Sequence, residues 1–161
     1  MMAGFLRPAA GRLAWQGVPI EADLATHRRQ LCYLGHADAV KGALTVRENL
    51  ALAVALSSGA SDRIDEALER FDLAALAQMP ARYLSAGQRR RVALARLLTG
   101  QRPLWLLDEP GVGLDATNRQ HLEKVIAAHR SGGGMVALAT HGDTTIGDAT
   151  GLELGPGVAD G

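Results

Sequence analysis

Leu104-Trp105-Leu106-Leu107-Asp108-Glu109-Pro110 begins as an unbroken apolar run and ends in two carboxylates and a proline. A short apolar run without alternation is typical of a parallel strand that is covered on both faces. Met135-Val136-Ala137-Leu138-Ala139 is a second run of this kind, and Thr140-His141 follows it. We therefore predict two parallel strands, each followed by side chains that can do chemistry.

The segment between these two runs has the pattern of a helix. Thr117 and Gln120 form a capping box, Leu122, Val125 and Ile126 share one helical face, and three glycines from Gly132 end the pattern. A strand, a helix and a second strand in this order predict a β-α-β crossover.

Outside these runs, the sequence predicts further strands and helices. Strands are expected over 13–16 and 31–34, and helices over 46–56, 62–77 and 89–98, two of them opened by the capping boxes Thr45/Glu48 and Ser85/Gln88. The pattern predicts an α/β fold, a parallel sheet with a helical subdomain at about 45–98. We assign residues 1–150 to this domain and the Gly/Pro-rich residues 151–161 to a flexible tail.

Composition limits the class of protein. The 161 residues are 47% hydrophobic and 21% charged, which is ordinary for one folded domain. Seventeen basic and seventeen acidic side chains cancel, so no overall field attracts nucleic acid. The apolar run 50–56 is too short to span a membrane, and Cys32 reads as a core residue. We expect a cytoplasmic location, and no nucleic-acid partner.

Side chains that follow the strands make the first candidate site. Ligands of open parallel sheets bind beyond the carboxyl ends of the strands, where Asp108, Glu109 and His141 are expected to converge. Adjacent acids there suit a nucleotide site, because one can hold Mg²⁺ while the other orients a water molecule. The alternative is a pair of acids that caps a helix.

The segment Leu84-Ser85-Ala86-Gly87-Gln88 makes the second candidate site. Its small residues leave the first backbone N–H groups of a helix open, and such a helix end favours anions. The alternative is a helix cap without a ligand. We assign the following Arg89-Arg90-Arg91 run, with Arg96, to a solvated face of the same helix, since no aromatic residues interleave.

Together these segments resemble the ABC ATPases, and the resemblance covers nearly the whole chain. Residues 84–88 resemble the signature motif, 104–109 Walker B, 112–115 the D-loop with Asp115, and His141 the switch histidine. The resemblance implies that Asp108 helps to bind Mg²⁺, that Glu109 is the general base and that His141 contacts the γ-phosphate of ATP. It also implies that Ser85, Gly87 and Gln88 contact a nucleotide held by a second ATP-binding subunit.

A narrower resemblance is to the ATP-binding subunits of haem exporters in cytochrome c maturation. It rests on Tyr33-Leu34-Gly35-His36 and on Pro103 before the Walker B run. His36 stands where most ABC ATPases have glutamine in the Q-loop, which puts the glutamine contact to Mg²⁺ in doubt; a buried structural histidine is the alternative. This resemblance implies ATP-driven haem export, integral membrane partner subunits and a peripheral position on the inner membrane.

These residues lack a phosphate-binding loop. Gly-x-x-x-x-Gly-Lys-Ser/Thr is absent, because neither Lys41 nor Lys124 precedes Ser or Thr. Residues 4–13 resemble the family segment just after the loop, as if the domain were truncated there. Hydrogen bonds to charged groups contribute about 1.5–3 kcal/mol each, whereas a micromolar site is worth about 8 kcal/mol in total. We therefore expect no useful ATP hydrolysis by this chain alone.

Two interpretations remain, and a third is excluded. The native protein is longer and is a complete transport ATPase, or the chain is a partner-binding module that lends Ser85 and Gly87 to a complete domain. The third, a chromosome-type ATPase that binds DNA, needs a long coiled coil before the signature motif, and residues 37–84 are too few for one.

Overall fold

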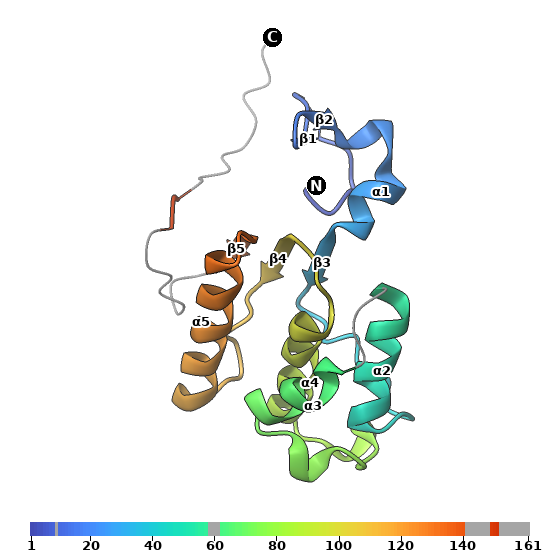
Figure 1. The fold of residues 1–161 in the computed structure, drawn as a ribbon, viewed down its shortest axis with the longest axis vertical. Helices are drawn as coiled ribbons and strands as arrows, with labels where there is room; N and C mark the ends of the chain where they lie inside the picture. Colours follow the sequence, from blue (N-terminus) through green and yellow to red (C-terminus); the bar gives the residue numbers. More distant parts are fainter. Residues whose placement is uncertain (9, 58–61, 141–148, 152–161) are drawn as a thin grey trace.

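A three-stranded parallel sheet forms the centre of the protein. The computed structural model describes residues 1–8, 10–57, 62–140 and 149–151. Strands β3 (Leu31–Leu34), β4 (Leu104–Asp108) and β5 (Met135–Ala139) lie in the order β3-β4-β5 (Figure 1). Helix α5 (Ala116–Ser131) connects β4 to β5. The predicted α/β fold, these three strands and the crossover are therefore confirmed.

Both faces of the central strand β4 are covered. Trp105 and Leu107 belong to the main hydrophobic cluster, together with residues of the helices, whereas Leu104 and Leu106 belong to a second cluster with Ala3. Because successive side chains of a strand point to opposite faces, a strand covered on both sides needs apolar residues at every position. This explains the unbroken apolar run that precedes Asp108.

Three helices pack beside the sheet and carry most of the core. Helices α2 (Val46–Ser57) and α3 (Arg63–Arg70) both pack on α4 (Ala86–Thr99), and they lie together in the lower part of Figure 1. Fully buried side chains of this cluster include Leu50, Leu68, Phe71, Leu94 and Leu97. Helix α4 also contacts α5 and strand β3, so it joins this group of helices to the sheet.

Two of the predicted capping boxes are confirmed and one is wrong. The amide and side chain of Thr45 exchange hydrogen bonds with those of Glu48, and Ser85 and Gln88 form the same pair at the start of α4. Helix α5 instead begins after Asp115, whose carboxylate accepts a 2.8 Å hydrogen bond from the amide of Asn118. Aspartate caps a helix at least as well as threonine, so the cap lies before Thr117.

Helix α3 is shorter than the predicted helix over 62–77. It ends at Arg70, and the chain turns through Asp72, which has a left-handed φ of 51°. The amide of Leu73 then donates to the carbonyl of Leu68 at 2.7 Å, a bond typical of a helix C-terminus. Phe71 and Leu73 are both fully buried on either side of this turn. Short 3-10 helices, η2 (Ala74–Leu76) and η3 (Ala81–Tyr83), follow.

The first part of the chain forms a small unit above the sheet in Figure 1. The predicted strand over 13–16 is shortened to β1 (Ala14–Trp15), and it pairs antiparallel with β2 (Val18–Pro19), which was not predicted. Gln16 and Gly17 both have positive φ, which is the geometry of a tight hairpin turn. The 3-10 helix η1 (Ile20–Ala22) and helix α1 (Leu24–Arg29) lead from the hairpin to β3.

Every helix in the ranges that the structure describes is too short or too polar to serve as a membrane span.

Candidate functional site

The two carboxylates lie where the sequence predicted, at the carboxyl end of β4. Asp108 is the last residue of the strand, and Glu109 follows it with a left-handed φ of 47°. The amide of Glu109 donates a 2.9 Å hydrogen bond to the carbonyl of Ala139, the last residue of β5. This bond ties the acidic pair to the end of the neighbouring strand. His141 lies outside the described residues, so its convergence with the acids stays a prediction.

A buried arginine joins this strand end to helix α4. Arg90 is 6% exposed, and its Nη2 donates to the carbonyl oxygens of Asp108 at 3.1 Å and of Glu109 at 2.7 Å. Its Nη1 donates to the carbonyl of Gly35 at 3.1 Å and to Oδ1 of Asp38 at 3.0 Å. A guanidinium group suits this role because it presents its donors in a rigid plane.

The assignment of the arginine run to a solvated helix face is therefore wrong at its centre. Three successive residues span about 200° of a helix, and α4 buries every residue from Val92 to Ala95. The run cannot lie wholly on the exposed side. Arg91 is also engaged, with the carbonyl of Phe71 and the carboxylate of Asp72. The apolar residues Val92–Ala95 follow the arginine run directly on the same helix. This spacing was the signal in the sequence that Arg90 would point toward the core, and it was missed.

The loop after β3 brings His36 to the same edge of the sheet. His36 is exposed, so the alternative of a buried structural histidine is wrong. Two residues further on, Asp38 forms an ion pair with the guanidinium of Arg90.

Cys32 lies within β3 and packs against the main cluster, as predicted. Burial raises the pKa of its thiol.

The sequence suggested either an anion site or a helix cap at residues 84–88, and the start of α4 has features of both. Gln88 donates its amide to Ser85 Oγ at 3.2 Å, while the amide of Ser85 donates to Gln88 Oε1 at 2.8 Å. Both side chains are therefore used in a cap, and both are exposed or partly exposed. A Cβ at Gly87 would lie 3.2 Å from the carbonyl oxygen of Gly113. The helix start thus lies close against the loop between β4 and α5.

Asp115 ends that loop and caps the start of helix α5. Its carboxylate accepts hydrogen bonds from the amide and from the side chain of Asn118, which lower its pKa. Leu114, 7% exposed, anchors the loop in the main cluster. The assignment of Asp115 to a D-loop stays a prediction.

The donors present fit only part of a nucleotide and Mg²⁺ site. Asp108 and Glu109 supply the carboxylate oxygens that Mg²⁺ and an attacking water need. In the part of the chain that the structure describes, however, no group of three or more acids, histidines or cysteines is arranged to hold a metal ion. The phosphate cradle is also absent from the sequence. These residues therefore do not by themselves fit ATP with its metal ion.

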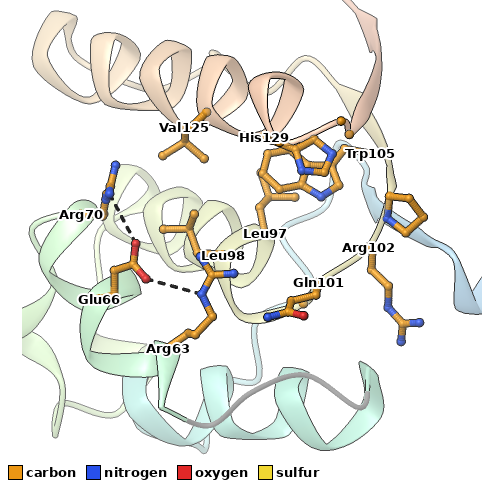
Figure 2. Close-up of a pocket in the computed structure, with 16 residues that line it drawn as sticks. Arg63, Glu66, Arg70, Leu97, Leu98, Gln101, Arg102, Trp105, Val125 and His129 are labelled. Carbon is orange, nitrogen blue, oxygen red and sulfur yellow. Dashed lines mark hydrogen bonds and ion pairs between the residues drawn. The ribbon is translucent and has the colours of Figure 1, made fainter.

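A groove of about 470 Å³ lies at the opposite end of β4 (Figure 2). Its wall includes the stacked rings of Trp105 and His129, whose centroids are 3.7 Å apart, and Glu66, which pairs with both Arg63 and Arg70. Burial lowers the pKa of His129. Because these residues surround the start of β4 rather than its end, the groove is separate from the candidate site.

The sequence of this chain is similar to those of known proteins. A sequence profile of the family described as ABC transporter matches residues 1–112. The "Cytochrome c biogenesis ATP-binding export protein CcmA" of Rhodospirillum rubrum is 49% identical over 154 residues, which are 96% of this chain and 66% of that protein. The protein of the same name from Paramagnetospirillum magneticum is 48% identical over 158 residues, 96% of this chain and 73% of that protein. This chain spans about two thirds of the length of such relatives.

Solved structures agree with these relatives. An ATP-binding subunit of an ABC transporter matches with a TM-score of 0.77 at 25% identity, over 87% of this chain and 60% of that one. A dimeric ATP-binding cassette bound to ADP and Pi matches with a TM-score of 0.71 at 26% identity, over 86% of this chain and 66% of that one. The broad and the narrower resemblance noted in the sequence are both confirmed, and the chain belongs to the ABC transporter family of ATP-binding domains.

Proposed function

We propose that this chain is the part of an ABC transporter ATP-binding subunit that carries the catalytic carboxylate, and that ATP hydrolysis there drives export in cytochrome c biogenesis. The observation that carries the proposal is the acidic pair Asp108-Glu109 at the carboxyl end of β4, tied by Arg90 to the helix that Ser85 opens. The names of the relatives support the export role and favour it over a partner-binding module. The proposed cargo is haem.

Each site residue has a role in this proposal. Glu109 is the general base that accepts a proton from the attacking water. Asp108 would supply one carboxylate oxygen to Mg²⁺, which would neutralise phosphate charge once residues outside this chain complete the site. His141 contacts the γ-phosphate and His36 occupies the Q-loop position. Ser85, Gly87 and Gln88 face the nucleotide of a second ATP-binding subunit, with Asp115 at the contact between the two subunits.

The partners follow from the same proposal. A second ATP-binding subunit completes each site, and integral membrane subunits supply the pathway, so the protein is cytoplasmic and peripheral on the inner membrane. The helical subdomain at about 45–98 is the proposed contact with those membrane subunits.

The phosphate cradle must come from residues other than these 161. The intact mass of the native protein, compared with 16.9 kDa, tells whether those residues belong to the same chain.

The test replaces Glu109 in the native gene and uses the complex purified with its membrane subunits. Glu109→Gln keeps the size of the side chain but removes the base, so ATP turnover should fall at least about 100-fold, and c-type cytochromes should be lost from the cells. Glu123→Gln on α5 is the matched control and should keep both. If Glu109→Gln retains wild-type turnover in an assembled complex, the proposed function is wrong.

A further inference from the structure

One buried guanidinium group connects three segments that are far apart in the sequence. Arg90, on α4, reaches the loop after β3 through Gly35 and Asp38 and reaches the end of β4 through Asp108 and Glu109. Its side chain is 7% exposed and the carboxylate of Asp38 is 25% exposed, so the ion pair is largely shielded from water. Loss of Asp38 would leave the buried guanidinium without its charged partner, which is costly.

The backbone of Glu109 depends on this connection. A glutamate with φ of 47° is in a region that residues with a side chain rarely adopt, and the surrounding structure must hold it there. Its amide is fixed by the carbonyl of Ala139 at 2.9 Å, and its carbonyl accepts from Arg90 at 2.7 Å. Both ends of the residue are thus anchored, and these anchors fix the direction in which its side chain leaves the backbone.

Other arginines of α4 do not make this contact. Arg91 donates to the turn after α3, at Phe71 and Asp72. Arg96 donates to the carbonyl of Asp38 at 3.3 Å and thus reaches the same loop as Arg90, but its hydrogen bonds do not extend to β4. Arg96 therefore separates the effect of holding the loop from the effect of holding the catalytic strand end.

We propose that Arg90 is a positioning residue for the catalytic carboxylate: it sets the backbone of Asp108 and Glu109 relative to the His36 loop and α4. The proposal rests on the proposed function, since it assumes that Glu109 is the base. Arg90 acts through the main chain and does not need to touch the nucleotide. Its loss should therefore slow the chemical step, while nucleotide affinity, which depends mainly on the phosphate cradle, should change little.

Arg90→Lys is the direct test, made in the native gene and measured on the complex purified with its membrane subunits. Lysine keeps the charge but cannot reach both pairs of acceptors, because its ammonium group lacks the planar fork. We expect kcat for ATP to fall at least about tenfold while KM stays within about twofold, the pattern of an interaction that matters in the transition state. Arg96→Lys should keep kcat within about twofold.

Several outcomes would overturn the proposal. They are an unchanged kcat in Arg90→Lys, a KM that rises as much as kcat falls, or an equal loss of kcat in Arg96→Lys. If Glu109→Gln abolishes turnover while Arg90→Lys does not, this inference fails and the proposed function stands. If Glu109→Gln itself retains turnover, the proposed function fails first.

A second variant covers the case in which Arg90→Lys does not assemble. Asp38→Asn leaves Arg90 in place and removes the charged acceptor of its Nη1, at 3.0 Å. It should lower kcat by about threefold or more with an unchanged KM, because the guanidinium loses part of its anchoring. An assembled Asp38→Asn complex with wild-type kcat would also overturn the proposal.

Discussion

Gly134→Ala should destabilise the protein far more than an added methyl group usually does. A Cβ at residue 134 would lie 2.6 Å from Cδ2 of His129 and closer still to Nε2 and Cε1 of the same ring. Ordinary contacts begin near 3.4 Å, so the imidazole must shift by about 1 Å or more. That ring is stacked on Trp105 with 3.7 Å between centroids and 5° between planes, so it cannot retreat on that side.

The size of the effect depends on how the ring responds. If the ring stays in place, the extra carbon costs about 1–3 kcal/mol; if it swings off Trp105 into the groove that both residues line, the lost stacking costs about 0.5–1.5 kcal/mol. We expect the free energy of unfolding to fall by about 0.5–3 kcal/mol. The strain requires the imidazole, so His129→Ala with Gly134→Ala should be no less stable than His129→Ala alone.

The assay is a double-mutant cycle by urea unfolding of the wild-type, both single variants and the double variant, followed by tryptophan fluorescence. A positive φ is not involved at Gly134, whereas Gly133 has a φ of 85° and open space around its Cβ position. Gly133→Ala is therefore a control for backbone strain, and His129→Ala should not rescue it. If His129→Ala fails to relieve the cost of Gly134→Ala, the steric argument is refuted.

Two further predictions concern a helix cap and a titration. Ser85→Ala removes the hydroxyl that caps α4 and should cost about 1 kcal/mol of stability in urea unfolding; an unchanged midpoint would contradict the cap. Burial lowers the pKa of His129 in the folded protein, so the unfolded chain binds more protons and stability should decrease as the pH falls through about 6.5. His129→Gln should weaken this dependence, and an identical pH profile for the variant would count against the assignment.

Strands and their carboxyl-end residues could be predicted because their signals are local. The unbroken run before Asp108 follows from burial on both faces, and the box formed by Ser85 and Gln88 is contained in four residues. The early end of α3 had no such signal. Asp72 adopts its left-handed conformation because Phe71 and Leu73 must both enter the core, which is a requirement of the tertiary structure.

The contacts of Arg90 could not be read from the sequence for a related reason. Its partners at Gly35, Asp38, Asp108 and Glu109 lie between 18 and 55 residues away. Three of the four acceptors are backbone carbonyls, which every residue possesses, so no side-chain pattern marks them. Asp115 was assigned to the D-loop by resemblance alone, and its capping bond to Asn118 shows that it also serves the local fold.

The two unequal clusters on either face of β4 give the protein parts of different local stability. The face toward the helices is fixed by the large cluster, whereas the opposite face is held by Ala3, Leu104 and Leu106 with a few partly buried neighbours. Regions with few buried apolar contacts open at lower free energy than the whole domain unfolds. We therefore expect the hairpin to open away from the sheet at a lower free energy than global unfolding, while the strand end that carries Asp108 and Glu109 stays folded on α4.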